Sequence, residues 1–250
     1  MGLILHIPHS SKKIPQKYLP NFLVSEKRLE EELLRMTDHF TDDLFNFDHP
    51  GITRIRFPVS RLLVDPERFE NDEEESMSKK GMGCIYEKTY DNKPLKEGHR
   101  KRDELINTFY RPHHEEFSSI IENSLKSNNQ VLIIDCHSFP KYPLQYESHQ
   151  EMDRAEICIG TDNFHTPTSL KNDFINQFEK LGFSVAVNDP FSGAIVPKKF
   201  YKRDSRARSL MIEVRRDLYM NEKTGKKLRG FAKLHDSLEK VILEVYEKHA

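Results

Sequence analysis

The chain has 250 residues, of which 36% are hydrophobic and 32% charged, so it can bury one large core, and we expect a single domain over residues 1–250. A formal net charge of −1 provides no basic field to attract nucleic acid or an anionic membrane. Cys84, Cys136 and Cys158 make neither a disulfide framework nor a CxxC zinc site, and no stretch is typical of a signal peptide or membrane span, so we expect a cytoplasmic protein.

The first half of the chain begins with a strand at 3–7, a short apolar run that ends at Pro8. Ser25 is a suitable N-cap for a helix that continues to about Phe45, because apolar residues recur there at three- and four-residue spacing. The stretch "GITRIRFPVSRLLVD" predicts two short strands separated by Pro58. The acidic, glycine-punctuated segment 70–83 predicts a mobile surface loop.

The second half of the chain alternates between helices and strands. We expect a helix over 99–126, interrupted near Pro112, and the strongest strand of the chain at 131–137. Three further strands are predicted in "AEICIG", "FSVAVN" and "SLMIEV", and further helices at 168–181 and 228–248. This alternation predicts an α/β fold with a mainly parallel sheet.

Polar residues at the ends of the predicted strands are candidates for a functional site, because ligands of open α/β sheets bind at the carboxyl ends of the strands. His9 follows the first strand, His137 ends "VLIIDCH", and Glu213 lies within the apolar run "SLMIEV". Two histidines and a carboxylate are a common ligand set of catalytic zinc. Each histidine alone could instead be a turn or packing residue, and a salt bridge to Arg215 or Arg216 could explain Glu213.

A further metal ligand is available in the predicted helical stretch "MTDHFTDDLF". Asp38 and Asp42 are four residues apart and would share one helical face. One carboxylate could then bind a metal while another holds a ligand histidine. His39 and Asp43 are also candidates in the same stretch, and the residues alone leave the choice open.

Seven short motifs extend from about residue 3 to 219 and read "PHSS", "TDHFTDDLF", "SRLLVDPERF", "FYRPHHEEF", "DCHSFP", "NDPFSGAIVPKKFY" and "SLMIEVRRDLY". Their identity and order resemble the N-formylglutamate amidohydrolase family. The resemblance implies a three-layer α/β/α fold of the phosphorylase/hydrolase-like type, with a mainly parallel mixed sheet, related to zinc carboxypeptidases.

The resemblance also implies an activity and its residues. The expected reaction is zinc-dependent hydrolysis of a C–N amide bond in a small N-formyl or N-acyl amino acid, with about one Zn²⁺ per chain. The family's metal ligands fall on His9, Asp38 and His137, and its general base falls on Glu213. That glutamate would take a proton from the metal-activated water.

Four further residues are candidates for binding the substrate. Arg61 and Arg68 could hold a substrate carboxylate, with Asp65 orienting one of them, although a structural ion pair would explain them equally well. His114 matches a family histidine that could polarise the substrate or simply pack. Gly193 lies in a loop suited to close backbone approach to a ligand, and its alternative is an ordinary turn.

Two positions depart from the family pattern. Glu67 stands where the family has asparagine, and Ser11 replaces the glycine of its "PHSG" motif. The first departure puts a negative charge near the expected carboxylate grip, and the second matters if that position needs a positive φ. A metallo-carboxypeptidase, a peptidoglycan amidase, or a non-catalytic binding protein on the same scaffold are therefore alternatives.

Overall fold

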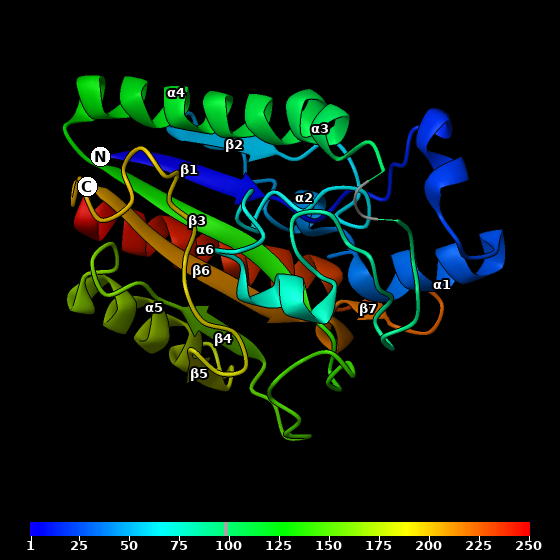
Figure 1. The fold of residues 1–250 in the computed structure, drawn as a ribbon. Helices are drawn as coiled ribbons and strands as arrows, with labels where there is room; N and C mark the ends of the chain where they lie inside the picture. The colour runs from blue at the N-terminus through cyan, green and yellow to red at the C-terminus, as the bar shows by residue number, and fades with distance from the viewer. Residues whose placement is uncertain (98–99) are drawn as a thin grey trace.

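A six-stranded mixed sheet forms the centre of the molecule (Figure 1). The computed structural model describes residues 1–97 and 100–250. The strand order is β2-β1-β3-β6-β4-β5; β4 is antiparallel to β6, and the other neighbouring pairs are parallel. The mainly parallel sheet is thus confirmed. Its strands are β1 (Gly2–Ile7), β2 (Ile52–Arg56), β3 (Val131–Phe139), β4 (Ile157–Gly160), β5 (Val185–Val187) and β6 (Ala207–Arg215).

Helices cover both faces of the sheet, which confirms the three-layer α/β/α architecture. Consecutive residues of a strand face opposite sides. In β3, Ile133 belongs to the buried cluster that includes Phe117 of α4, whereas Ile134 belongs to the cluster that includes Phe174 of α5 and Val241 of α6. The α-helices are α1 (Glu26–Met36), α2 (Thr41–Leu44), α3 (Arg102–Leu105), α4 (Arg111–Asn128), α5 (Thr168–Lys180) and α6 (Phe231–His249).

The segment around Asp38 differs from the expected helix. Ser25 caps α1 as predicted, but this helix ends at Met36, and α2 begins only after Phe40, whose φ is 64°. The backbone N–H of Asp38 instead donates to the carbonyl of His9 at 3.0 Å. Asp38 therefore lies in a turn between two helices, and the prediction that it shares a helical face with Asp42 is wrong. A tertiary hydrogen bond has replaced helix continuation here.

One more sequence prediction requires correction. Only the first of the two strands expected around Pro58 forms, as β2; residues 59–64 make turns and bends. The acidic segment 70–83 lies largely at the surface, as predicted, and contains a short 3-10 helix (Ser76–Lys80). The buried Glu75 organises this segment, because its carboxylate accepts hydrogen bonds from the backbone N–H groups of Phe69 and Met77.

The predicted helix over 99–126 is built from α3, a π-helical turn at Ile106–Tyr110, and α4; residue 99 itself lies outside the described residues. Pro112 lies just after the π-helical turn, in which the N–H of Arg111 donates to the carbonyl of Ile106, so the hydrogen bonding of the helix changes locally where the proline lacks an N–H. Two small strands, β7 (Met220–Asn221) and β8 (Lys226–Lys227), pair beside the sheet. In the described part of the chain, none of the helices combines the length and apolar character needed to cross a membrane.

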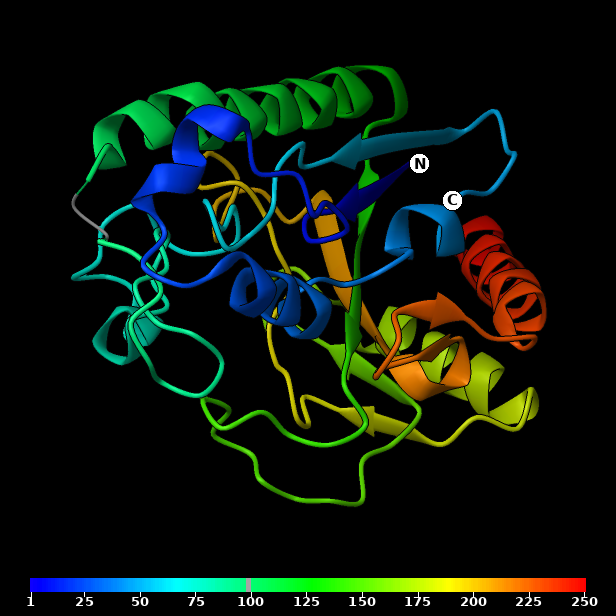
Figure 2. The same ribbon diagram turned by 90° about the vertical axis from the view of Figure 1, so that its right-hand side faces the viewer.

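The two ends of the chain lie side by side at the start of β1 (Figures 1 and 2). The hydroxyl of Tyr246 in α6 donates to the carbonyl of Met1. The long connections that follow β1, β2 and β3 gather at the other end of the sheet (Figure 2). Because β1, β3 and β6 run parallel, their carboxyl ends point toward these connections, where a ligand site is expected.

Candidate active site

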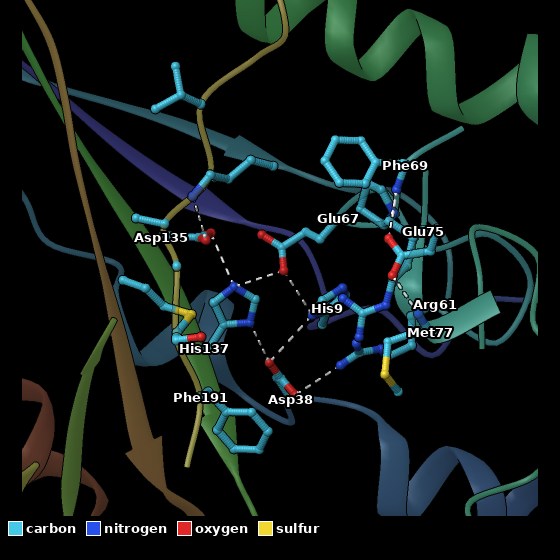
Figure 3. Close-up of a pocket in the computed structure, with 18 of the residues that line it drawn as sticks. His9, Asp38, Arg61, Glu67, Phe69, Glu75, Met77, Asp135, His137 and Phe191 are labelled. Carbon is cyan, nitrogen blue, oxygen red and sulfur yellow. Dashed lines mark hydrogen bonds and ion pairs between the residues drawn. The ribbon is translucent and has the colours of Figure 1, made fainter. Parts of the chain in front are cut away.

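A cavity of about 1470 Å³ opens at the carboxyl ends of the parallel strands, and it contains the main candidates (Figure 3). His9 lies just after β1, while His137 and Glu213 occupy paired register positions in β3 and β6. All three side chains are almost fully buried. The structure thus brings together residues that are more than 70 positions apart in sequence.

Each of the two histidines is held by a carboxylate on one side of its ring. His9 Nε2 lies 2.9 Å from Asp65 Oδ1, and His137 Nδ1 lies 3.1 Å from Asp38 Oδ2. An ionised carboxylate only accepts hydrogen bonds, so these nitrogens carry the protons. In a neutral ring the other nitrogen, His9 Nδ1 or His137 Nε2, then presents a lone pair to a metal, and neither of these nitrogens makes a hydrogen bond with the described residues.

Glu67 faces both lone pairs. Its Oε2 lies 3.7 Å from His9 Nδ1 and 3.0 Å from His137 Nε2, and its Oε1 makes no hydrogen bond with the described residues. The three donor atoms lie within 4.8 Å of one another. Two neutral imidazoles and one carboxylate, with each histidine held from behind by a carboxylate, form a donor set that fits an open zinc site.

Asp38 and Glu67 face different nitrogens of His137, as Figure 3 shows, and Asp38 Oδ2 also lies 3.8 Å from His9 Nδ1. The same Oδ2 accepts the N–H of Ser138 at 3.2 Å, and Asp38 Oδ1 accepts from Arg216 Nη2 at 2.8 Å. Burial alone would raise the pKa of Asp38, but hydrogen bonds from His137 and His9 and the charge of Arg216 hold it well below its usual value. Asp38 is thus an ionised carboxylate that accepts a hydrogen bond from His137, and the group of donors that converges with Glu67 does not include it.

The electrostatic environment of His137 favours positive charge at its Nε2. Burial alone would lower the pKa of its imidazole, but the surrounding carboxylates of Glu67, Asp135 and Asp38 raise this pKa well above the usual value. Without a metal, this positive charge is a second proton on the ring, and a bound metal ion would take the place of that proton. Asp135 Oδ1 lies 3.1 Å from His137 Nε2. Several carboxylates therefore create a strongly negative potential at the point where the donors converge.

Glu213 is a buried carboxyl group with an incomplete set of partners. Burial is the main cause that raises its pKa to about 8, and its Oε2 makes no hydrogen bond with the described residues. The salt-bridge explanation is wrong, because Arg215 pairs with Asp217 and Arg216 pairs with Asp38. Glu213 is one of the residues that line the cavity.

The two candidate arginines differ in their surroundings. Arg61 Nη2 lies 2.9 Å from Asp65 Oδ2, and its Nε lies 3.1 Å from the hydroxyl of Tyr86. This matches the structural ion pair considered for it. Arg68 also lines the cavity, but its guanidinium forms no ion pair or side-chain hydrogen bond within the described ranges. Of the two, Arg68 has the free donors that a carboxylate ligand needs.

His114 and Gly193 both line the cavity. His114 Nε2 lies 2.9 Å from the carbonyl of Pro66, to which it donates, and burial lowers its pKa to about 4, so the ring is neutral. This contact holds the loop that carries Glu67. Gly193 has a φ of +97°, a conformation that glycine adopts at little cost. Ser11 has no positive φ, so the family's glycine is not required there.

Sequence reasoning missed two functional candidates and undervalued a third. Glu67 was treated only as a departure from the family pattern, and Asp135 and His6 were not considered. The spacing held a signal: Asp135 and His137 are two residues apart in a strand and therefore face the same side. Asp65 and Glu67 have the same separation in the connection that follows β2.

Comparison with known proteins gives consistent results. The family model for N-formylglutamate amidohydrolase matches residues 1–220. The crystal structure of an N-formylglutamate amidohydrolase from Ralstonia eutropha JMP134 has a TM-score of 0.86 and 23% sequence identity, covering 99% of this chain and 94% of that chain. The crystal structure of a gene product from Agrobacterium tumefaciens has a TM-score of 0.66 and 22% identity, covering 98% and 91%. No curated protein matches the sequence significantly.

Proposed function

The chain belongs to the N-formylglutamate amidohydrolase family, and from this premise we propose that it is a zinc-dependent hydrolase of the amide bond in a small N-formyl or N-acyl amino acid. The observation that carries this proposal is the convergence of two buried imidazole lone pairs on the Glu67 carboxylate. We propose His9, His137 and Glu67 as the metal ligands. Glu67 thereby replaces Asp38, for which we propose an orienting role on His137.

The proposed chemistry divides between the metal and the side chains. When bound, zinc supplies a Lewis acid that polarises the amide carbonyl and lowers the pKa of water to about 7. Glu213 accepts a proton from the attacking water and then delivers it to the leaving nitrogen. Its burial and its unpartnered oxygen leave it available for this exchange.

Substrate binding is assigned to the other residues that line the cavity. Arg68 is proposed to bind the carboxylate of the amino-acid moiety, because its guanidinium is free of internal partners among the described residues. Gly193 is proposed to let the loop backbone approach the substrate. Arg61 and His114 have a supporting role, because the first is bound to Asp65 and the second to the loop that carries Glu67.

The experiment combines metal analysis with turnover. The purified protein should contain about one zinc per chain, and it should hydrolyse members of a panel of N-formyl and N-acyl amino acids. His9→Ala and His137→Ala should lose both metal and activity. Glu213→Gln should keep the metal and lose turnover. A metal-free wild-type protein that still hydrolyses these amides would refute the zinc assignment, and no turnover on any amide would favour a binding protein.

A second candidate substrate class follows from the size of the cavity. At about 1470 Å³, the cavity exceeds the roughly 300–1000 Å³ of pockets for small ligands. It can therefore admit a substrate longer than a formylated amino acid, as the carboxypeptidase and peptidoglycan amidase alternatives require. Short peptides and peptidoglycan fragments belong in the same panel, and a higher kcat/KM on them would identify a peptide hydrolase.

A further inference from the structure

A chain of three buried side chains lies behind the proposed metal ligands. His113 Nε2 of α4 lies 3.0 Å from His6 Nε2 of β1, and His6 Nδ1 lies 2.8 Å from Asp135 Oδ1 of β3. None of the three is more than 4% exposed. The chemistry proposed above uses none of them, although buried polar groups of this kind are costly unless they are fully paired.

The hydrogen bonds of this chain have one direction. The Asp135 carboxylate accepts, so His6 carries its proton on Nδ1. We assign the second bond the same direction, so that Nε2–H of His113 donates to Nε2 of His6. Aromatic packing holds both rings in place: His6 stacks on Phe117 at 4.7 Å between centroids, and His113 contacts Phe57 edge-on at 5.0 Å.

Asp135 is the point where this chain meets the site. Its Oδ1 lies 3.1 Å from His137 Nε2, and its Oδ2 accepts the backbone N–H of Ile195 at 3.4 Å, in the loop that carries Gly193 (Figure 3). The orientation of one carboxylate therefore affects both a proposed metal ligand and the loop beside the substrate.

We propose that His113 and His6 are positioning residues, which fix the Asp135 carboxylate against His137 and the Ile195 backbone. This inference rests on the proposed function, because its consequence is the geometry of the metal ligand His137. It assigns a role to α4, because the first turn of this helix sets the orientation of a carboxylate on β3 through a histidine on β1.

The same residues allow another interpretation. His6, Glu67 and Asp135 also offer donor atoms within 4.8 Å of one another, a spacing that would suit a second metal ion. We call the positioning of Asp135 by His113 and His6 the relay. The relay is favoured over a second metal site because His6 Nδ1 and Asp135 Oδ1 are already joined by a hydrogen bond of 2.8 Å. The nitrogens of His9 and His137 that face Glu67 have no such hydrogen bond with the described residues.

A crossed pair of substitutions tests the relay. The asparagine amide nitrogen replaces Nδ1 of histidine, and the longer glutamine places its nitrogen near Nε2. His6→Asn and His113→Gln therefore keep the donor that the relay needs, and His6→Gln and His113→Asn lose it. Zinc affinity, measured by competition with a chelator, should fall by about 10-fold to 100-fold in the second pair and by less than about threefold in the first.

A role in packing alone predicts a different order. The larger glutamine would then be the better replacement at both positions, so this result would refute the relay. His165→Phe is a matched control, because His165 is a buried histidine whose nitrogens bond Ala207 and Lys202 in another part of the fold. It should lower the melting temperature and leave zinc affinity unchanged.

Two more measurements separate the remaining outcomes. Histidine ¹⁵N NMR of the wild-type protein should find the Nδ1–H form of His6 and the Nε2–H form of His113, and the opposite form at either position would overturn the relay even if the variants do not fold. The wild-type protein could also bind a second equivalent of zinc that both His6→Gln and His6→Asn lose. That result would make His6 a ligand of a second metal ion and would refute the relay. A wild-type protein that binds no zinc would refute the proposed function, and the NMR result would still decide the relay.

Discussion

Exchanging a single carboxylate for its amide, at Glu67 or at Asp38, distinguishes the metal ligand from the residue that orients it. Glu67→Gln removes the charge of a carboxylate whose Oε1 makes no hydrogen bond within the described ranges. Asp38→Asn removes the partner of Arg216, a guanidinium that is only 4% exposed and lies 2.8 Å from the carboxylate. The two substitutions are alike in size and charge change, so each serves as the control for the other.

The two substitutions should rank in opposite order for the two quantities: Asp38→Asn should lower stability more, and Glu67→Gln should weaken zinc binding more. Without metal, Asp38→Asn leaves a buried guanidinium unpaired and should lower the free energy of unfolding by about 3–5 kcal/mol. Glu67→Gln should lower this free energy less, because it leaves no buried guanidinium unpaired. With metal, Asp38→Asn should weaken zinc binding by about 10-fold to 100-fold, as outer partners of ligand histidines do, and Glu67→Gln should weaken it much more.

Urea unfolding of the metal-free proteins gives the first quantity, and chelator competition with zinc gives the second. Both are measured at one pH and ionic strength, with circular dichroism to verify that the variants are folded. Asp38→Asn could instead abolish zinc binding while Glu67→Gln retains it within about 10-fold. That result would refute the proposal that Asp38 only orients His137, and it would support Asp38 as the third metal ligand.

Three further substitutions have defined outcomes. Arg68→Gln should raise KM about 10-fold to 100-fold with little change in kcat, because it loses a charge-assisted bond of about 1.5–3 kcal/mol; the exposed Arg206→Gln is its control, and equal KM values would exclude a carboxylate grip. Burial lowers the pKa of Lys96 from 10.5 to about 7, so the folded protein gains stability as pH rises from 7 toward 10.5. Lys96→Met should thus change the free energy of unfolding more favourably at pH 6 than at pH 10, by about 4 kcal/mol in urea titrations. Gly193→Ala should cost about 1–3 kcal/mol in the same assay, because alanine is strained at the φ of +97°, and an unchanged value would mean that the loop adopts another conformation.

The strands at the centre of the sheet could be predicted from the sequence because local and tertiary preferences agree there. The apolar runs of β1, β3 and β6 are buried on both faces, and such runs favour strands in a parallel layer. Their carboxyl ends then had to meet at one edge. For this reason His9, His137 and Glu213 could be grouped without knowledge of the fold.

The roles of Asp38 and Glu67 could not be predicted in the same way. The periodic pattern continues through Asp38, but its backbone N–H is taken by the His9 carbonyl from a distant loop, and no local rule anticipates that bond. Glu67 follows Pro66 in a loop without secondary structure, and its position depends on contacts such as the one between His114 and the Pro66 carbonyl. Loop side chains of this kind are positioned by tertiary contacts rather than by periodicity.

The balance of charge around the converging donors gives a further argument for a cation. Asp38 is paired with Arg216 at 2.8 Å and Asp65 with Arg61 at 2.9 Å. Glu67 and Asp135, by contrast, have only histidines as ionic partners among the described residues. Burial raises the pKa of Glu213 to about 8, so this group adds less negative charge than the other two near neutral pH. Uncompensated charge is expensive in a buried region, and a divalent cation held by His9, His137 and Glu67 would neutralise the two carboxylates.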